Sequence, residues 1–193
     1  ELNRFLAMKL ILDGTASDPE RVSRFVQEAQ VMGQIDHPGI VPVHDLGIDA
    51  RGRVFFTMQL VDGRDLREII DLAREEREGW STRRLVDVLV RVCEAMAYAH
   101  SKGVLHRDLK PGNIFLSRHH DETLVKVLDF GIARIFQQDE EPKTTQEQNR
   151  LTRAGEVFGT PAYISPEQAR GDRDLTPASD LYSLGAMLYE MLQ

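Results

Sequence analysis

The eight residues His106-Arg107-Asp108-Leu109-Lys110-Pro111-Gly112-Asn113 decide how this chain of 193 residues folds. They include three charged side chains, one proline and one glycine. Proline has no backbone N–H, and glycine favours turns, so the octapeptide predicts a loop instead of a regular helix or strand. Its polar side chains can therefore converge on one site.

A second polar group follows sixteen residues after Asn113, at Asp129-Phe130-Gly131. It comes directly after an apolar run, 124–128, that predicts a strand. A carboxylate at a strand end beside an amide from another loop gives the oxygen ligands that Mg²⁺ prefers, so Asn113 and Asp129 are candidate metal ligands. Asp108 can accept a proton from an attacking hydroxyl group, and Lys110 can neutralise charge on a transferred phosphoryl group.

Lys9 leaves two interpretations open. It stands inside the apolar run Phe5–Ile11, where burial of an unpaired ammonium group is costly. It either lies at a strand edge and extends to water, or forms a buried pair with Glu28 that holds a phosphate group. Glu28 falls in one row with the apolar face of a predicted helix over 19–35, which favours the pair. Neither residue decides between the two.

The rest of the chain divides into a β-rich part and a helical part. The first part predicts strands at 5–11, 40–48 and 53–61, and a helix at 19–35 with Asp18 as its N-cap. The second predicts helices over 65–78, 82–102, 166–169 and 177–193, and strands at 114–116 and 124–128. We expect the boundary near 59–63. The polar stretch 137–156 predicts a long loop.

Composition excludes several classes of protein. With 41% apolar and 28% charged residues the sequence is that of an ordinary globular protein, and no apolar run is long enough to cross a bilayer. Twenty-four basic and 31 acidic residues give a net charge of −7, which argues against nucleic-acid binding. We expect no signal peptide, because no basic segment followed by an apolar stretch stands at the start of this sequence. Cys93 is expected to be a small core residue of the helix over 82–102.

These motifs resemble those of the protein kinase family, specifically the eukaryotic-like Ser/Thr kinases of bacteria. The likeness rests on the octapeptide 106–113 followed by 129–131, and continues through Gly159-Thr160-Pro161-Ala162-Tyr163, Ser165-Pro166-Glu167 and 180–185. The resemblance implies an α+β, bilobal protein-kinase-like fold. Residues 1–61 then form a small, β-rich, incomplete N-lobe, and residues 62–193 a larger, helical, incomplete C-lobe.

The resemblance also assigns roles to single positions. Lys9 matches the lysine that holds the α- and β-phosphates and Glu28 its helix partner; Asp108 matches the catalytic base, and Lys110-Pro111 the Ser/Thr-specific form of the loop. The adenine site is implied at Ala7, Met58 (gatekeeper), Gln59, Val61 and Phe115. The regulatory spine is implied at Met32, Val43, His106 and Phe130, anchored by Asp180. Thr160 and Glu167 match the platform that receives a peptide.

The expected activity is that of a serine/threonine protein kinase that transfers the γ-phosphoryl group of ATP to protein hydroxyl groups, with ATP and Mg²⁺ as cofactors. Two alternatives stay open: a small-molecule phosphotransferase, and a nucleotide-binding or scaffolding module without turnover. The resemblance implies protein substrates, self-association during autophosphorylation and a cytoplasmic location. This segment is expected to contact neither nucleic acid nor a membrane, although a longer parent protein could carry a membrane anchor.

We expect a piece of a longer protein, because the chain begins at Glu1 and stops at Gln193 inside a helical pattern. The Gly-rich loop would precede Lys9 by more residues than are present. In the family, Glu167 pairs with an arginine on a late helix, so we expect an uncompensated carboxylate here and a piece that aggregates or melts at low temperature, with negligible kinase activity.

Thr152 is the expected activating phosphorylation site. It lies in the polar loop seven residues before Gly159. A phosphate at Thr152 could pair with Arg107, directly before Asp108, and order the loop. Thr144 and Thr145 compete with Thr152 in the same loop, and all three could equally be solvated surface residues.

Overall fold

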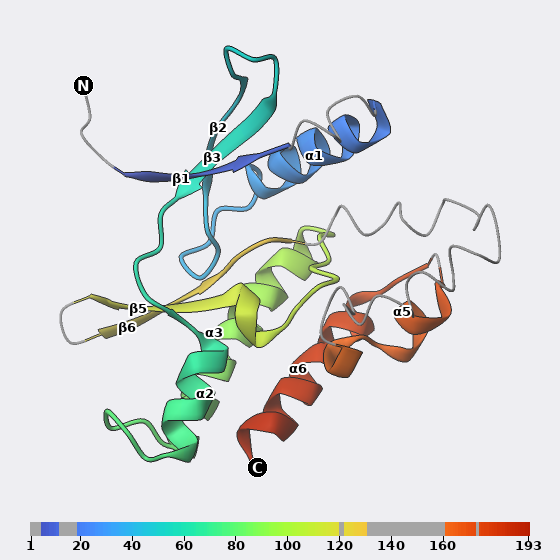
Figure 1. Cartoon of the computed structure of the whole chain (residues 1–193). Coiled ribbons are helices and arrows are strands. Elements are labelled where there is room, and N and C mark those ends of the chain that lie inside the picture. Colours follow the sequence, from blue (N-terminus) through green and yellow to red (C-terminus); the bar gives the residue numbers. More distant parts are fainter. Residues whose placement is uncertain (1–4, 12–18, 120–121, 131–160, 173) are drawn as a thin grey trace, which may run out of the picture.

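The computed structural model describes residues 5–11, 19–119, 122–130, 161–172 and 174–193. Two three-stranded antiparallel sheets, in the orders β1-β3-β2 and β4-β5-β6, occupy the upper and middle parts of the molecule in Figure 1. In chain order the helices and strands are β1 (Leu6–Leu10), α1 (Pro19–Met32), β2 (Val43–Ile48), β3 (Val54–Gln59), β4 (Arg64–Asp65), α2 (Leu66–Arg74), α3 (Thr82–Ser101), β5 (Ile114–His119), β6 (Glu122–Val127), α5 (Pro166–Arg170) and α6 (Pro177–Met191).

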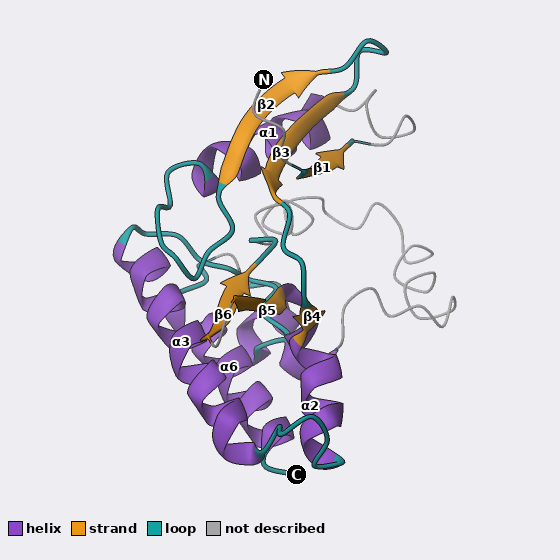
Figure 2. Cartoon of the chain, turned by 90° about the vertical axis from the view of Figure 1, so that its left-hand side faces the viewer, coloured by secondary structure: helices purple, strands orange, loops and turns teal. Residues whose placement is uncertain are grey.

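The first sheet carries α1 on one face. Phe25 and Ala29 of α1 pack with Phe56 of β3 and with Ile11, the residue after β1, in a small core of their own. The Phe25 and Phe56 rings lie 4.9 Å apart, a spacing that favours tilted aromatic pairs. Figure 2 shows this layer above the helical part of the molecule.

The larger core lies among α2, α3, α6 and the second sheet. α3 contributes seven buried side chains at helical spacing, and these make one continuous apolar face: Leu85, Val88, Leu89, Val92, Ala95, Met96 and Ala99. Figure 2 shows α3 and α6 side by side beneath the sheet. The helical part is thus organised around these two long helices.

The segment between α1 and β2 attaches the upper layer to the lower one. The Val41 N–H donates to the Val127 carbonyl at 3.1 Å, and the Val127 N–H donates to the Gly39 carbonyl at 2.8 Å. Ile40, which we expected in a strand of the first sheet, bridges to Val127 of β6 instead. Pro42 offers no N–H to continue that ladder, and β2, which pairs with β3, begins at Val43.

α2 is shorter than the helix expected over 65–78. It ends at Arg74, with Glu75 as C-cap, and Glu76 takes the left-handed conformation at φ 52°. The Arg77 N–H then donates to the Leu72 carbonyl and the Glu76 N–H to the Ala73 carbonyl, which is a Schellman ending. Because the position after the cap holds a glutamate and not a glycine, no stop signal is visible there in the sequence.

Cys93 is exposed, so the expectation that it belongs to the core is wrong. It follows the fully buried Val92 by one residue. One residue turns a helix by about 100°, which carries the side chain off the buried face of α3. Its apolar neighbours in sequence had suggested a position on that face.

The α+β bilobal fold expected from the motifs is confirmed by the β-rich upper layer and the helical lower part. The division into 1–61 and 62–193 stays a prediction. The segment at 39–41, from the first of these parts, forms backbone hydrogen bonds with β6 of the second. Within the part of the chain that the structure describes, no helix is long and apolar enough to span a bilayer.

Candidate active site

Lys9 forms an ion pair with Glu28. The Lys9 Nζ atom lies 2.7 Å from Glu28 Oε1 and 3.1 Å from Asp129 Oδ1. The Glu28 side chain is only 4% exposed, because α1 presses it against the sheet that carries Lys9. Of the two interpretations of Lys9, the structure therefore agrees with the one in which Lys9 pairs with Glu28. Asp129, 120 positions away in sequence, adds a second carboxylate.

Burial and charge act in opposite directions on this pair. Burial lowers the pKa of Lys9, but Glu28 and Asp129 together raise it above its ordinary value. Burial raises the pKa of Glu28, and the attraction of Lys9 offsets this only in part. Lys9 thus stays a cation, while the Glu28 carboxylate carries the cost of desolvation.

The loop 106–113 gathers two polar side chains, those of Lys110 and Asn113, around Asp108. Lys110 Nζ donates to Asp108 Oδ2 at 2.9 Å. Asn113 Nδ2 donates to the Asp108 carbonyl at 2.8 Å and lies 3.4 Å from Asp108 Oδ2. The amide oxygen of Asn113 makes neither bond. The loop predicted from proline and glycine content therefore presents Asp108, Lys110 and Asn113 together.

Backbone bonds join this loop to the segment that carries Asp129. The Leu128 N–H donates to the Asn113 carbonyl at 2.8 Å, and His106 Nε2 lies 2.9 Å from the Leu128 carbonyl. The Phe130 ring is fully buried with its centroid 4.7 Å from that of His106. Asp129 itself takes a left-handed backbone, φ 51°, that non-glycine residues rarely adopt, and such strain is typical of functional sites.

Asp180 of α6 holds the first two residues of the loop 106–113 through hydrogen bonds to their backbone. Its carboxylate accepts hydrogen bonds from the N–H groups of His106 at 2.9 Å and Arg107 at 2.8 Å. A third contact joins Asp180 Oδ2 to His100 Nε2 at 2.7 Å. Asp180 is almost fully buried, so these donors compensate its desolvation. No pattern in the sequence indicated the His100 contact.

The donor set fits a hard divalent cation bound together with a polyphosphate. Among the described residues no cluster of three or more His, Cys, Asp or Glu side chains could hold a metal by itself. Mg²⁺ is usually held by one or two protein oxygen ligands, with substrate phosphates and water completing its shell. The Asp129 carboxylate and the Asn113 amide oxygen provide such ligands on adjoining segments.

The comparison with known families agrees with this geometry. A model of the protein kinase domain matches residues 1–193. The chain belongs to the protein kinase family.

Curated relatives of this kinase domain include the serine/threonine-protein kinase pkn3 of Myxococcus xanthus, 40% identical over 192 residues, and PknB of Mycobacterium tuberculosis, 40% identical over 195 residues. Each alignment covers 99% of this chain but only 33% and 28% of the relative, respectively. The chain thus spans about a third of the length of these relatives. A crystal structure of the M. tuberculosis PknI kinase domain is similar with a TM-score of 0.65, at 27% identity over 96% of this chain and 61% of that chain.

The residues implied for the adenine site of this kinase domain come from both sheets. Ala7 of β1 is the cross-strand neighbour of Met58 in β3, and Phe115 lies in β5 of the second sheet. Gln59 ends β3 and is exposed, and Val61 in the connection to β4 is half-buried. The structure therefore places Ala7 and Met58 together above the connection and Phe115 in the layer below it.

The four residues implied for the regulatory spine are buried or half-buried. Met32, His106 and Phe130 are fully buried, and Val43 packs against the clusters on both sides of it. Only the contact between His106 and Phe130 is a ring pair. Burial of this kind is also what ordinary core residues show.

Glu167 accepts a hydrogen bond from a serine of α6. Its side chain is half-exposed, and Ser179 Oγ donates to Glu167 Oε1 at 2.6 Å. The Ser179 hydroxyl is the main reason that the pKa of Glu167 lies below its ordinary value. The Glu167 carboxylate thus has a hydrogen-bond donor on α6, but a hydroxyl group carries no positive charge, so the expected lack of an arginine partner stays a prediction. Thr152, its competitors Thr144 and Thr145, and Thr160 lie outside the described residues.

Two polar contacts near the site were not expected from the sequence. Gln168 Nε2 donates to the Arg107 carbonyl at 2.6 Å. The Tyr163 hydroxyl donates to Glu190 of α6, and burial followed by this bond raises the pKa of Tyr163. A capping-box pattern, serine followed three residues later by glutamine, was visible at 165–168, but it indicates only a helix start.

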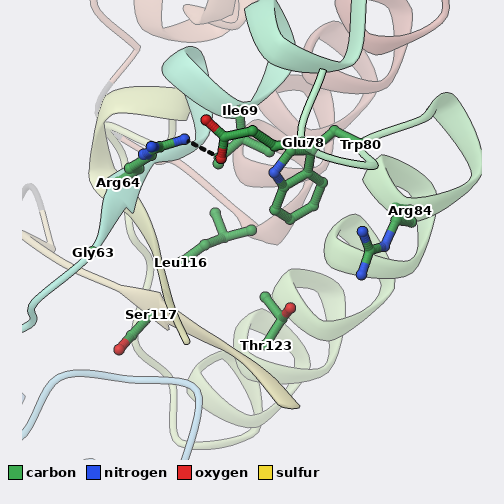
Figure 3. Close-up of a pocket in the computed structure, with 9 residues that line it drawn as sticks. All are labelled: Gly63, Arg64, Ile69, Glu78, Trp80, Arg84, Leu116, Ser117 and Thr123. Atoms are coloured by element: carbon green, nitrogen blue, oxygen red, sulfur yellow. Dashed lines mark hydrogen bonds and ion pairs between the residues drawn. The ribbon is translucent and has the colours of Figure 1, made fainter. Parts of the chain in front are cut away.

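A separate cavity of about 250 Å³ lies between the second sheet and the helices α2 and α3. Figure 3 shows it between the Arg64–Glu78 ion pair, Trp80 and Leu116. None of the residues implied for nucleotide or metal binding lines it. The residues around Lys9, Asp108 and Asp129 lie outside this cavity and remain the candidate active site.

Proposed function

We propose that the protein is a serine/threonine protein kinase that transfers the γ-phosphoryl group of Mg²⁺-bound ATP to hydroxyl groups of protein substrates. The observation that carries this proposal is the simultaneous presence of the Lys9–Glu28 ion pair and of Asp129 within 3.1 Å of Lys9. Kinase catalysis needs both the lysine–glutamate pair and the metal-binding aspartate in position. Relatives named as serine/threonine-protein kinases support the class of acceptor.

Each side chain has one task in this mechanism. Lys9 holds the α- and β-phosphates of ATP, and Glu28 orients its ammonium group. Asp129 and Asn113 would hold the metal ion, which would neutralise negative charge on the phosphates. Asp108 accepts the proton of the serine or threonine hydroxyl as the oxygen attacks the γ-phosphorus and the bond to the β–γ bridging oxygen breaks.

Lys110 lies beside Asp108 and contributes electrostatically. Its ammonium group donates to Asp108 Oδ2 at 2.9 Å, so it keeps the carboxylate oriented toward the acceptor hydroxyl. The same positive charge faces the transferred phosphoryl group, where negative charge is spread over three oxygens. A preorganised cation of this kind requires no reorganisation during the transfer step.

Radiolabelled ATP, Mg²⁺ and casein, incubated with the full-length protein, test the proposal. We expect label on serine and threonine of casein and of the protein itself, and none with a Lys9→Met variant. Label that appears only on small molecules would favour the small-molecule phosphotransferase. Mg·ATP binding without any transfer would favour the scaffolding module. Omission of Mg²⁺ with EDTA present is expected to abolish transfer.

A further inference from the structure

Gln168 makes two backbone contacts with one side-chain amide. It is the third residue of α5, and its Oε1 atom accepts a hydrogen bond from the Ser165 N–H at 3.1 Å. Its Nε2 atom donates to the Arg107 carbonyl at 2.6 Å, across a sequence separation of 61 residues. One contact closes the capping box of α5, and the other reaches the loop that carries Asp108.

The peptide group that Gln168 holds is a strained one. Arg107 has φ 65°, in the left-handed region that residues with a β-carbon rarely adopt. Its N–H donates to Asp180 Oδ1 at 2.8 Å, and its carbonyl accepts from Gln168. Side chains from α6 and α5 therefore hold both polar backbone groups of Arg107. Strained conformations persist where the surroundings restrain them in this way.

Arg107 directly precedes Asp108, so its backbone dihedral angles set where the Asp108 carboxylate points. The Asp108 side chain is further held by Lys110, and the Asp108 carbonyl by Asn113. We propose that Gln168 is a positioning residue for Asp108, acting through the Arg107 carbonyl. This inference rests on the proposed kinase function, in which Asp108 is the catalytic base.

Position 168 needs a glutamine and not a glutamate because one of its two partners requires an acceptor and the other a donor. Glutamate and glutamine serve equally at the third position of a capping box, because that position needs only an acceptor for the N-cap N–H. The Arg107 carbonyl needs a donor, which a carboxylate lacks. Gln168→Glu therefore removes the bond to Arg107 and leaves an acceptor for Ser165.

The test compares kcat, the KM for casein and the Kd for Mg·ATP in the full-length protein and its variants. Gln168→Glu is expected to lower kcat about tenfold, because small displacements of a reacting group are costly. Both binding constants and the melting temperature are expected to stay near those of the parent. Gln168→Met, which is uncharged and loses both bonds, is expected to lower kcat at least as much and is available if Gln168→Glu folds poorly.

Two control variants measure the effect of added charge and the effect of a weakened capping box. Gln30→Glu adds the same charge on an exposed position of α1 and is expected to leave kcat unchanged. Ser165→Ala removes the hydroxyl that accepts from the Gln168 N–H at 3.3 Å, but leaves the bond to Arg107. It is expected to lower the melting temperature and leave kcat within twofold of the parent value.

The pH profile distinguishes positioning from a structural role. Protonation of the new carboxyl group in Gln168→Glu restores a donor to the Arg107 carbonyl. The ratio of variant to parent kcat is therefore expected to rise as the pH falls toward the ordinary glutamate pKa of about 4.3. A kcat within twofold of the parent for both Gln168 variants, or losses of kcat that follow losses of melting temperature with a flat ratio, would overturn the inference. A parent protein that transfers no phosphate refutes the proposed function instead.

Discussion

Lys9 and Glu28, 19 residues apart in sequence, meet with Lys9 Nζ 2.7 Å from Glu28 Oε1. One side chain comes from β1 and the other from α1, so the distance between them reports how the helix is docked on the sheet. The Glu28 carboxylate is buried, whereas the Lys9 side chain is 35% exposed and has Asp129 as a second partner. Lys9 therefore keeps a charged partner if Glu28 is replaced, whereas the buried Glu28 carboxylate relies on Lys9 for its ion pair.

Glu28→Gln is expected to lower phosphoryl transfer by about ten- to a hundredfold, because Lys9 loses the group that orients it. The free energy of unfolding is expected to change by no more than about 1 kcal/mol, because Lys9 keeps Asp129 and the substitution removes a desolvated carboxylate. Steady-state kinetics and denaturant unfolding measure both quantities. Glu94→Gln, at an exposed position of α3, is the charge-matched control. A large loss of stability would show that the pair is mainly structural.

Asp108→Asn is expected to lower kcat by about 10²- to 10⁴-fold, the usual contribution of a general base. The Kd for Mg·ATP is expected to stay within a few-fold of the parent value, because Asp108 meets the acceptor hydroxyl and not the nucleotide. Isothermal titration calorimetry and single-turnover kinetics separate the two effects. If ATP affinity falls together with kcat, Asp108 is not the acceptor-side base.

Asp129→Asn is expected to act on the metal-bound nucleotide. The substitution removes a charged metal ligand, so the Kd for Mg·ATP rises while that for ATP measured in EDTA changes little. Titration of a fluorescent ATP analogue with and without Mg²⁺ measures the difference. Equal loss of affinity in both conditions would contradict a role for Asp129 in metal binding.

Thr152 is expected to be phosphorylated by the protein itself, with Thr152→Ala reducing activity severalfold through loss of a phosphate that pairs with Arg107. Burial lowers the pKa of the half-buried Arg107, which nevertheless stays a cation at neutral pH. Mass spectrometry after incubation with ATP locates the site. Phosphate found only on Thr144 or Thr145, or full activity in Thr152→Ala, would show the assignment to be wrong.

Because the His106 side chain is fully buried, we expect the protein to lose stability in mild acid. Burial holds the pKa of His106 below its ordinary value of 6.5, although Asp180 partly opposes the shift. Below pH 6.5 the unfolded chain therefore takes up a proton that the folded protein refuses, and the free energy of unfolding falls by about 1.4 kcal/mol per pH unit until the lowered pKa is reached. Denaturant unfolding at pH 7.5, 6.5 and 5.5 measures this slope. His106→Phe is expected to have the shallower slope, and equal slopes would contradict the prediction.

Local rules predicted much of the secondary structure. The hydrophobic spacing of α3 and α6 indicated these two helices nearly to the residue. The proline and glycine at 106–113 indicated a loop, although its last three residues, Pro111–Asn113, form a short 3-10 helix. Local rules failed where the deciding contact came from elsewhere. The strand expected from Ile40 begins only at Val43, because Ile40 bridges to β6. β4 was not predicted, because two residues carry no periodicity and form a strand only by pairing with β5.

The sequence by itself determined the chemical groups of this kinase domain, because Asp108, Lys110 and Asn113 lie within one short loop and Asp129 follows a strand at a fixed distance. Only the tertiary structure decided which side chains hold the backbone of the loop that carries these groups. Asp180 and Gln168 hold Arg107 from residues 73 and 61 positions away, and no local pattern states that an aspartate or a glutamine will face a particular peptide group. Such bonds form because packing of α5 and α6 brings their side chains to buried N–H and C=O groups that must be paired.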